Sequence, residues 1–307
     1  MTADAGAGRE DGPLQGRLPS GAVQDGSAEA VERVVTALAG LPGVAGIVLG
    51  GSRARGTAVP GSDVDIGLYY RTRERPAFAS LVALAQRLDD DGRPRGAGTY
   101  GEWGPWINGG VWLQVGGFAT DVLLRDVDRV RDVVQACSQG RLEVDYQPGH
   151  PHAFVSSVYA AEVFHNVPLH DPRGLLAELR ALVDPYPHAL AVGTVRRFLW
   201  EAGFALGTAR AAAGRGDTAY VTGCAFRAVS CLVQVLHAVN RVYLPNEKGA
   251  VAAVDRMPRA PHDFSGTVGA ALTRMDRDPA HLVDGLDVLA SLVDRTAELA
   301  APLLDGA

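Results

Sequence analysis

The sequence predicts an α+β protein in which a mixed-sheet α/β domain is followed by an all-helical bundle domain. Strand patterns alternate with helical patterns up to about residue 147, whereas only helical periodicity follows Pro148. The chain has 307 residues, 47% of them hydrophobic and 21% charged, which is ample for two globular domains. We predict a first domain over 28–147 and a second over 148–307, preceded by a disordered, Gly- and Ala-rich segment over 1–27.

The elements of the first domain follow from apolar spacing and from turn residues. One helical face opens the domain, with apolar side chains at Ala30, Val31, Val34, Val35 and Leu38. Further along, a Gly-Gly pair separates two alternating apolar runs and predicts a tight β-hairpin. The predicted helices cover 27–41, 53–58 and 78–89, and the predicted strands cover 44–49, 63–70, 111–115 and 118–124.

The second domain consists of helical patterns separated by Pro, Gly and Asp. Asp217 stands directly before one of them and is predicted to cap that helix. The predicted helices cover 155–166, 171–183, 188–214, 218–243, 248–257 and 266–303.

The segment over residues 50–65 carries the clearest chemical signal. An apolar strand ends in Gly50-Gly51-Ser52, and Asp63 and Asp65 follow, one residue apart at the start of the next strand. Side chains alternate along a strand, so both carboxylates point to one side, where their repulsion favours a divalent cation. Glycines let backbone N–H groups approach a phosphate closely. A metal site beside a phosphate cradle is the apparatus of phosphoryl or nucleotidyl transfer.

This pattern resembles the signature of the polymerase-beta-like nucleotidyltransferase superfamily, and within it the bacterial small-molecule branch of aminoglycoside and lincosamide nucleotidyltransferases. The resemblance implies that Ser52 and the backbone at Gly51 hold the triphosphate of an NTP, with ATP as the expected donor. It also implies that Asp63 and Asp65 bind two Mg²⁺ ions and that a later strand supplies a third carboxylate. Asp121 fits that place, because it interrupts the apolar run over 118–124.

Two kinds of basic residue are candidates for the phosphates. Arg53 and Arg55 both lie in the glycine loop, and we expect one of them, assigned as Arg55, to contact phosphate while the other faces water. Lys248 is the single lysine of an arginine-rich chain and follows the Pro245-Asn246 turn at a predicted helix start. Similar transferases carry a lysine after such a turn, which implies that Lys248 reaches the triphosphate.

Four further residues are candidates for the acceptor substrate. Glu102 and Trp103 lie in a Gly- and Trp-rich loop, where a carboxylate and aromatic faces suit a cationic substrate. The tryptophans are equally suited to filling the protein interior. Asp145 and His152 lie near the predicted domain boundary, where the resemblance places an acceptor.

Composition restricts the partners. The net charge is −6, from 29 basic and 35 acidic residues, which disfavours nucleic acid and anionic membranes. The three cysteines include no CxxC pair, the N-terminus has no signal-peptide pattern, and no apolar run approaches the roughly 20 residues of a membrane helix. We predict a cytoplasmic monomer or homodimer that does not contact the membrane.

The function predicted from these residues is transfer of a nucleoside monophosphate, expected to be AMP, to a hydroxyl of a small molecule such as an aminoglycoside-like antibiotic, with release of pyrophosphate. The first predicted domain would be catalytic and the second would bind substrate and nucleotide. Two alternatives remain open: a toxin-like transferase acting on a protein or tRNA, and a non-catalytic nucleotide-binding regulator.

Overall fold

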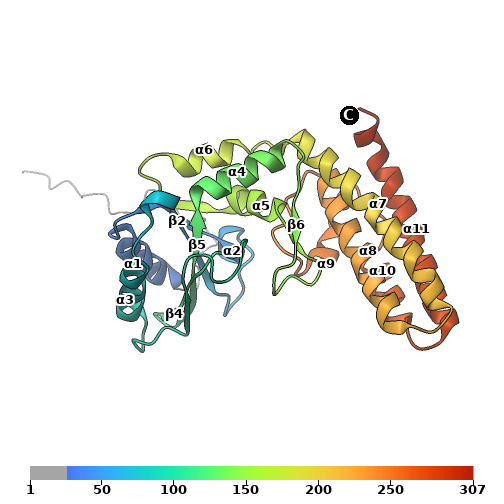
Figure 1. Cartoon of the computed structure of the whole chain (residues 1–307), viewed down its shortest axis with the longest axis horizontal. Coiled ribbons are helices and arrows are strands. Elements are labelled where there is room, and N and C mark those ends of the chain that lie inside the picture. Colours follow the sequence, from blue (N-terminus) through green and yellow to red (C-terminus); the bar gives the residue numbers. More distant parts are fainter. Residues whose placement is uncertain (1–25, 307) are drawn as a thin grey trace, which may run out of the picture. The chain divides into compact units, whose positions relative to one another are not determined.

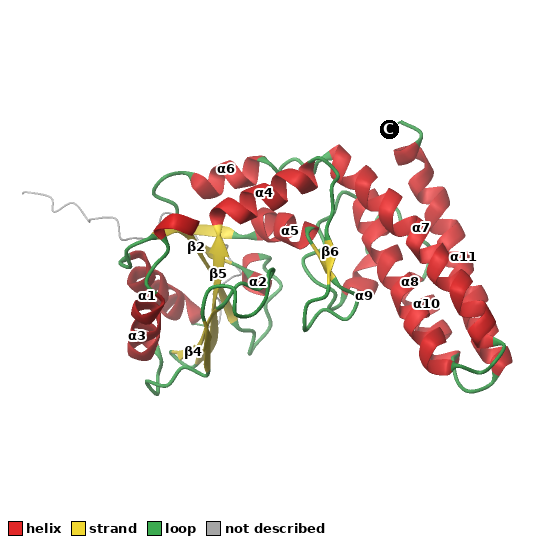
Figure 2. Ribbon diagram, viewed as in Figure 1, coloured by secondary structure: helices red, strands yellow, loops and turns green. Residues whose placement is uncertain are grey.

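A computed structural model describes residues 26–306, which form two compact units. The first contains the residues up to Arg131 together with His165–Arg180, and the second contains Asp132–Phe164 and everything from Ala181 onward. Of the predicted disordered segment 1–27, residues 1–25 lie outside the described part of the chain. The predicted fold class is confirmed, because a mixed α/β sheet is followed by a helical C-terminal part (Figures 1 and 2).

The first unit is built on a six-stranded sheet in the order β3-β4-β5-β2-β1-β8. Its β2 and β5 are parallel, and every other neighbouring pair is antiparallel. The strands are β1 (Val44–Leu49), β2 (Val64–Tyr70), β3 (Gly96–Gly98), β4 (Gly110–Val115), β5 (Phe118–Asp126) and β8 (Val167–His170). The helices are α1 (Ser27–Ala39), α2 (Gly51–Ala54), the 3-10 turn Thr72–Glu74, α3 (Phe78–Leu88), α4 (Val127–Ser138), which runs on into the second unit, and α6 (Leu175–Ala181).

One face of this sheet forms the core of the unit with α1 and α3 (Figure 1). The predicted stripe of α1 is confirmed, and its five apolar side chains are buried. They pack with Val64, Ile66 and Leu68 of β2, and with the alternating apolar residues of β4 and β5. The residues between these positions, including Asp65 and Asp121, therefore point to the opposite face.

The β4–β5 hairpin is also confirmed. Gly116 and Gly117 have φ values of 58° and 81°, as a two-residue primed turn requires. Their N–H groups donate hydrogen bonds of 2.9 and 2.8 Å to the carboxylate of Asp90, which fixes the turn further.

Two small strand pairings differ from the sequence prediction. β8 joins the first unit's sheet beside β1, and β6 (Val144–Asp145) pairs with β7 (Phe154–Val155). Both are too short to show a two-residue alternation in the sequence. Pro168 within β8 also argues against a strand, although it is tolerated here because β8 is an edge strand.

The second unit is a helical bundle in which α7, α8, α10 and α11 lie side by side (Figure 1). Its helices are α5 (Ser157–His165), α7 (His188–Ala213), α8 (Thr218–Val239), α9 (Ala250–Val254), α10 (Phe264–Arg274) and α11 (Pro279–Leu304). Asp217 caps α8 as predicted, accepting a hydrogen bond from the Tyr220 N–H at 3.2 Å.

Several predicted helix bounds after residue 148 are wrong. The helix predicted over 218–243 ends at Val239, and the one predicted over 171–183 covers only Leu175–Ala181. The pattern over 266–303 is two helices, because Asp278 accepts a hydrogen bond from the Ala280 N–H and Pro279 starts α11. The helix predicted from Lys248 begins only at Ala250, after Gly249 with φ 71°.

The sequence predicts no apolar run near the length of a membrane span, but helix α8 reaches that length. Its length and composition would allow it to cross a membrane, but 56% of its most apolar window is buried inside the bundle. A core helix of a soluble protein has the same properties, and the structure is compatible with one.

Candidate functional site

Asp65 and Asp121 are direct neighbours in the sheet of the first unit. In the parallel pairing of β2 with β5, Asp65 is the register partner of Asp121. Both side chains therefore leave the same face of the sheet, opposite the core formed with α1 and α3. Asp63, exposed just before β2, adds a third negative charge: burial first, and then Asp63, raises the pKa of the Asp121 carboxyl, while Arg95 lowers it.

This donor set suits a hard divalent cation, because carboxylate oxygens are the ligands that Mg²⁺ prefers. Asp63, Asp65 and Asp121 are the residues that would hold it. Within residues 26–306, however, no three His, Cys, Asp or Glu side chains already stand in a metal-holding arrangement. The register of β2 and β5 brings the carboxylates to one place without closing them into a ligand cage.

The Gly50-Gly51-Ser52 turn lies directly against Asp65. The Gly50 N–H donates a 2.8 Å hydrogen bond to the Asp65 carbonyl. Gly51 has φ 60°, and a Cβ on it would lie 1.7 Å from the Asp65 Oδ2, so only glycine fits. Ser52 follows, half-buried, in α2, which covers Gly51–Ala54 and is shorter and earlier than the helix predicted over 53–58. Gly51 and Ser52 thus stand beside the carboxylate pair.

The two loop arginines have different environments. Arg53 is 1% exposed and its guanidinium donates to the Asp63 carbonyl at 3.0 Å, the Ser62 carbonyl at 2.6 Å and the Ser27 hydroxyl at 2.9 Å. It therefore neither contacts phosphate nor faces water, and it fixes the backbone that carries Asp63. Arg55 is half-buried, and its guanidinium makes no hydrogen bond or ion pair with the described residues.

An aromatic pair stands on the same face as the carboxylates. Trp112 on β4 is the register partner of Asp121 and is 41% exposed. Trp103 stacks on it, with ring centroids 4.5 Å apart and planes at 13°. Sequence reasoning selected Trp103 and missed Trp112, although its position between Val111 and Leu113, both buried, indicated the opposite face.

Two other residues of the Trp-rich loop, Glu102 and Trp106, contact the protein itself. The Glu102 carboxylate is exposed and accepts a 2.7 Å hydrogen bond from the Thr99 N–H. Trp106 is fully buried, with the Arg129 guanidinium 4.9 Å from its ring centroid. Trp106 thus fills the protein interior, which was one of the two interpretations of the tryptophans, whereas Trp103 belongs to the partly exposed pair.

Lys248, Asp145 and His152 belong to the second unit. Lys248 is exposed in the turn before α9, and its N–H donates a 2.8 Å hydrogen bond to the Asn246 side chain. Asp145 is exposed on β6. His152 is 6% exposed, which makes it a buried residue rather than a surface contact.

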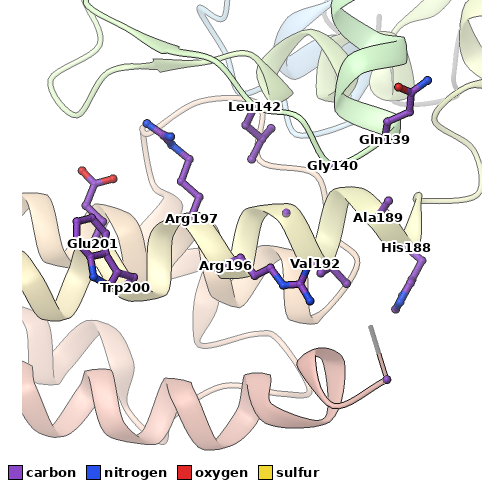
Figure 3. Close-up of a pocket in the computed structure, with 12 residues that line it drawn as sticks. Gln139, Gly140, Leu142, His188, Ala189, Val192, Arg196, Arg197, Trp200 and Glu201 are labelled. Atoms are coloured by element: carbon purple, nitrogen blue, oxygen red, sulfur yellow. The ribbon is translucent and has the colours of Figure 1, made fainter.

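The second unit also contains an open groove of about 760 Å³ along α7. Figure 3 shows Arg196, Arg197, Trp200 and Glu201 projecting from this helix, with His188 at its start. Trp200 is 67% exposed and stacks on Phe204, with ring centroids 5.0 Å apart. None of the residues selected from the sequence lines this groove.

Two family models match parts of this chain. Residues 31–101 match the family model described as a nucleotidyltransferase domain, and 152–249 match one described as a domain of unknown function (DUF4037). No curated protein matches the chain. Among solved structures, the nucleotidyltransferase-like protein from Exiguobacterium sibiricum 255-15 is 10% identical with a TM-score of 0.47, over 91% of this chain and 78% of that chain.

The first match includes Ser52, Asp63 and Asp65 and supports a general nucleotidyl transfer activity. A nucleotidyltransferase domain implies an NTP substrate, and such domains generally use a divalent metal. The aminoglycoside-like branch of the superfamily stays a prediction.

Proposed function

We propose that this chain is a Mg²⁺-dependent nucleotidyltransferase of the cytoplasm. It would transfer a nucleoside monophosphate, with ATP as the expected donor, to a hydroxyl of a small molecule and release pyrophosphate. The observation that carries the proposal is the in-register pair Asp65 and Asp121 beside the Gly51-Ser52 turn. The match of residues 31–101 to a nucleotidyltransferase domain supports it.

The residues would divide the work as follows. When bound by Asp63, Asp65 and Asp121, two Mg²⁺ ions would supply neutralisation of the charge on the triphosphate. The Ser52 hydroxyl and the N–H groups of the glycine turn would bind phosphate oxygens, and Arg55 and Lys248 would add positive charge there. The carboxylate of Asp121 or Glu102 would accept the proton of the acceptor hydroxyl, whose oxygen attacks the α-phosphorus as pyrophosphate leaves.

A cationic acceptor such as an aminoglycoside-like antibiotic suits the net charge of −6. Trp103 and Trp112 offer flat faces on the carboxylate side of the sheet, where a ring of the acceptor or of the nucleotide base could stack.

The first test is thermal unfolding of the wild type and of Asp63→Asn with each of the four NTPs, with and without Mg²⁺. Ligand at about 100 times Kd would stabilise the wild type by roughly 2.7 kcal/mol, a shift of a few degrees. We expect a Mg²⁺-dependent shift with one NTP, and a smaller shift in Asp63→Asn. The NTP that passes is then used in an acceptor screen that detects pyrophosphate, in which Asp63→Asn should be inactive. Full activity of Asp63→Asn would refute the assignment of this carboxylate.

A transferase acting on RNA is the second candidate, and the groove along α7 favours it. Exposed aromatic rings beside arginines are typical of surfaces that bind single-stranded nucleic acid. The acidic net charge counts against it. Filter binding of labelled tRNA at two salt concentrations decides between a small-molecule acceptor and an RNA acceptor. Salt-sensitive binding that Trp200→Ala weakens would favour the RNA acceptor.

A further inference from the structure

A small cavity inside the second unit has no role in the proposed transfer reaction. Its volume is about 150 Å³, and it lies among α8, α9 and α10 and the turn before α9. Eight of the twelve residues that line it are apolar, so the cavity suits a largely apolar molecule. One face of α8 forms a wall, with lining residues at helical spacing: Phe226, Val229, Ser230, Val233 and Gln234.

Gln234 brings an unpaired amide group to this lining. The residue is 7% exposed, and its side chain makes no hydrogen bond within residues 26–306. Both of its amide atoms nevertheless keep accessible surface, whereas the ring nitrogens of His152 are enclosed. Because Gln234 belongs to the face of α8 that lines the cavity, this surface faces the cavity. A buried amide without a partner is costly, and native proteins usually retain one for a reason.

Asn240, at the end of the same helix, has a fully bonded amide. Its nitrogen donates to the carbonyls of Leu236 and Arg259 at 2.7 and 2.8 Å, and its oxygen accepts a 3.0 Å hydrogen bond from the Arg259 N–H. Gln234 has no such partners in the described part of the chain. The two donors and the acceptor of its amide are therefore available to a ligand.

The other polar residues of the lining are engaged or enclosed. The Ser230 hydroxyl donates a 2.9 Å hydrogen bond to the Phe226 carbonyl. The Glu247 carboxylate accepts hydrogen bonds of 3.2 and 3.3 Å from the main-chain N–H of His152, whose ring nitrogens are enclosed. The Glu247 charge repels an anion, and a cation would lose its hydration against the apolar side chains. The lining therefore favours a neutral ligand whose hydrogen bonds are made with Gln234.

We propose that this cavity is a binding site for a small neutral ring that carries an N–H next to a C=O, as a lactam does, and that this pair exchanges two hydrogen bonds with the Gln234 amide. A primary amide presents its own N–H and C=O side by side, so it is complementary to another amide. A cavity of this volume accommodates one six-membered ring. The site is independent of the transfer reaction, and its test needs no nucleotide.

The isomers 2-pyridone and 4-pyridone are matched probes, because only 2-pyridone has its N–H and C=O on adjacent ring atoms. Titration calorimetry on the full chain at pH 7 should show 2-pyridone bound about tenfold more tightly than 4-pyridone, the effect of one additional buried hydrogen bond. Gln234→Met should bind both isomers with equal affinity. This variant loses no hydrogen bond of residues 26–306, so without ligand its melting temperature should be at least that of the wild type.

Gln135→Met is the control, since Gln135 is exposed on α4 and does not line the cavity; it should keep the preference for 2-pyridone. As a measurement that needs no variant, 2-pyridone should shift the side-chain NH₂ signals of Gln234 and leave those of Gln135 unchanged. The proposal is overturned by equal affinity of the wild type for both isomers, by no binding of either, or by a preference that persists in Gln234→Met. A melting temperature of Gln234→Met several degrees below that of the wild type would also overturn it, because the amide would then have partners within the protein.

Discussion

Arg53 shows how one buried side chain sets the position of a carboxylate. Its guanidinium bonds the carbonyls of Ser62 and Asp63 and the hydroxyl of Ser27, so it joins the loop to the start of α1. A planar group with five donors can satisfy three acceptors at once, which an ammonium group cannot do in the same geometry. Arg53 is a positioning residue for Asp63.

Replacement of Arg53 by Met should therefore lower the free energy of unfolding by about 2–4 kcal/mol, because buried carbonyls lose a charged donor. Arg55→Met should change it by about 0.5 kcal/mol or less, since the Arg55 side chain makes no hydrogen bond or ion pair with residues 26–306. Urea denaturation of the two variants measures this difference. Under the proposed function, Arg55→Met should instead raise the KM for the NTP. Equal stabilities of the two variants would show that the contacts of Arg53 do not hold the loop.

His152 predicts a pH dependence of stability. Its pKa is about 4 in the folded protein and about 6.5 in the unfolded chain, so only the unfolded chain takes up the proton between these values. The stability that is present above pH 6.5 is thus lost as the pH falls towards 4, by roughly 2–4 kcal/mol. The melting temperature of the wild type should fall more steeply over this range than that of His152→Leu. Parallel curves would mean that His152 is protonated as easily in the folded protein as in the unfolded one.

Among the elements, the turn between β1 and α2 depends on Gly51. Its φ of 60° and the 1.7 Å approach of a Cβ to the Asp65 Oδ2 make it the most constrained glycine of the loop, whereas Gly56, with φ 67°, has no atom within 4 Å of a Cβ. Both glycines adopt the left-handed region, so an alanine at either position carries a similar backbone cost of about 1 kcal/mol.

Only Gly51→Ala should displace the Asp65 carboxylate. We expect Gly56→Ala to lose about 1 kcal/mol of stability and keep nucleotide-dependent thermal stabilisation, and Gly51→Ala to lose more stability and most of that stabilisation. Thermal unfolding with the NTP selected above and Mg²⁺ measures both quantities. If the NTP stabilises the two variants equally, the glycine turn at Gly51 is not part of the nucleotide site.

At the scale of the whole molecule, the sheet of the first unit depends on a strand from far along the chain. β8 pairs antiparallel with β1, and without it β1 would become an exposed edge strand with unpaired N–H and C=O groups. A fragment over 26–147, which follows the predicted domain boundary, ends before β8.

We therefore predict that a fragment over 26–181 unfolds cooperatively and at a higher temperature than a fragment over 26–147, which should aggregate. Circular dichroism melts and size-exclusion chromatography of the two fragments give the comparison. Equal melting temperatures would mean that β8 adds nothing to the sheet, and the boundary at residue 147 would then stand.

The sequence by itself determined the features that depend on neighbours in the chain. Four such features are each encoded in a short continuous segment. They are the Asp63-x-Asp65 pair after a glycine turn, the apolar stripe of α1, the Gly116-Gly117 hairpin and the Asp217 cap. These features depend on side-chain periodicity and local backbone preferences, so they can be predicted from the sequence before the fold is known.

Only the tertiary structure decided which distant residues meet. Asp121 could be selected as a carboxylate in an apolar strand, but its pairing with Asp65 depends on the parallel register of β2 and β5. The same holds for Trp112 beside Asp121, for the buried contacts of Arg53 and for β8 at the sheet edge. Strand register and burial result from the packing of the whole core, because each buried face must be covered at once, and no short segment contains that information.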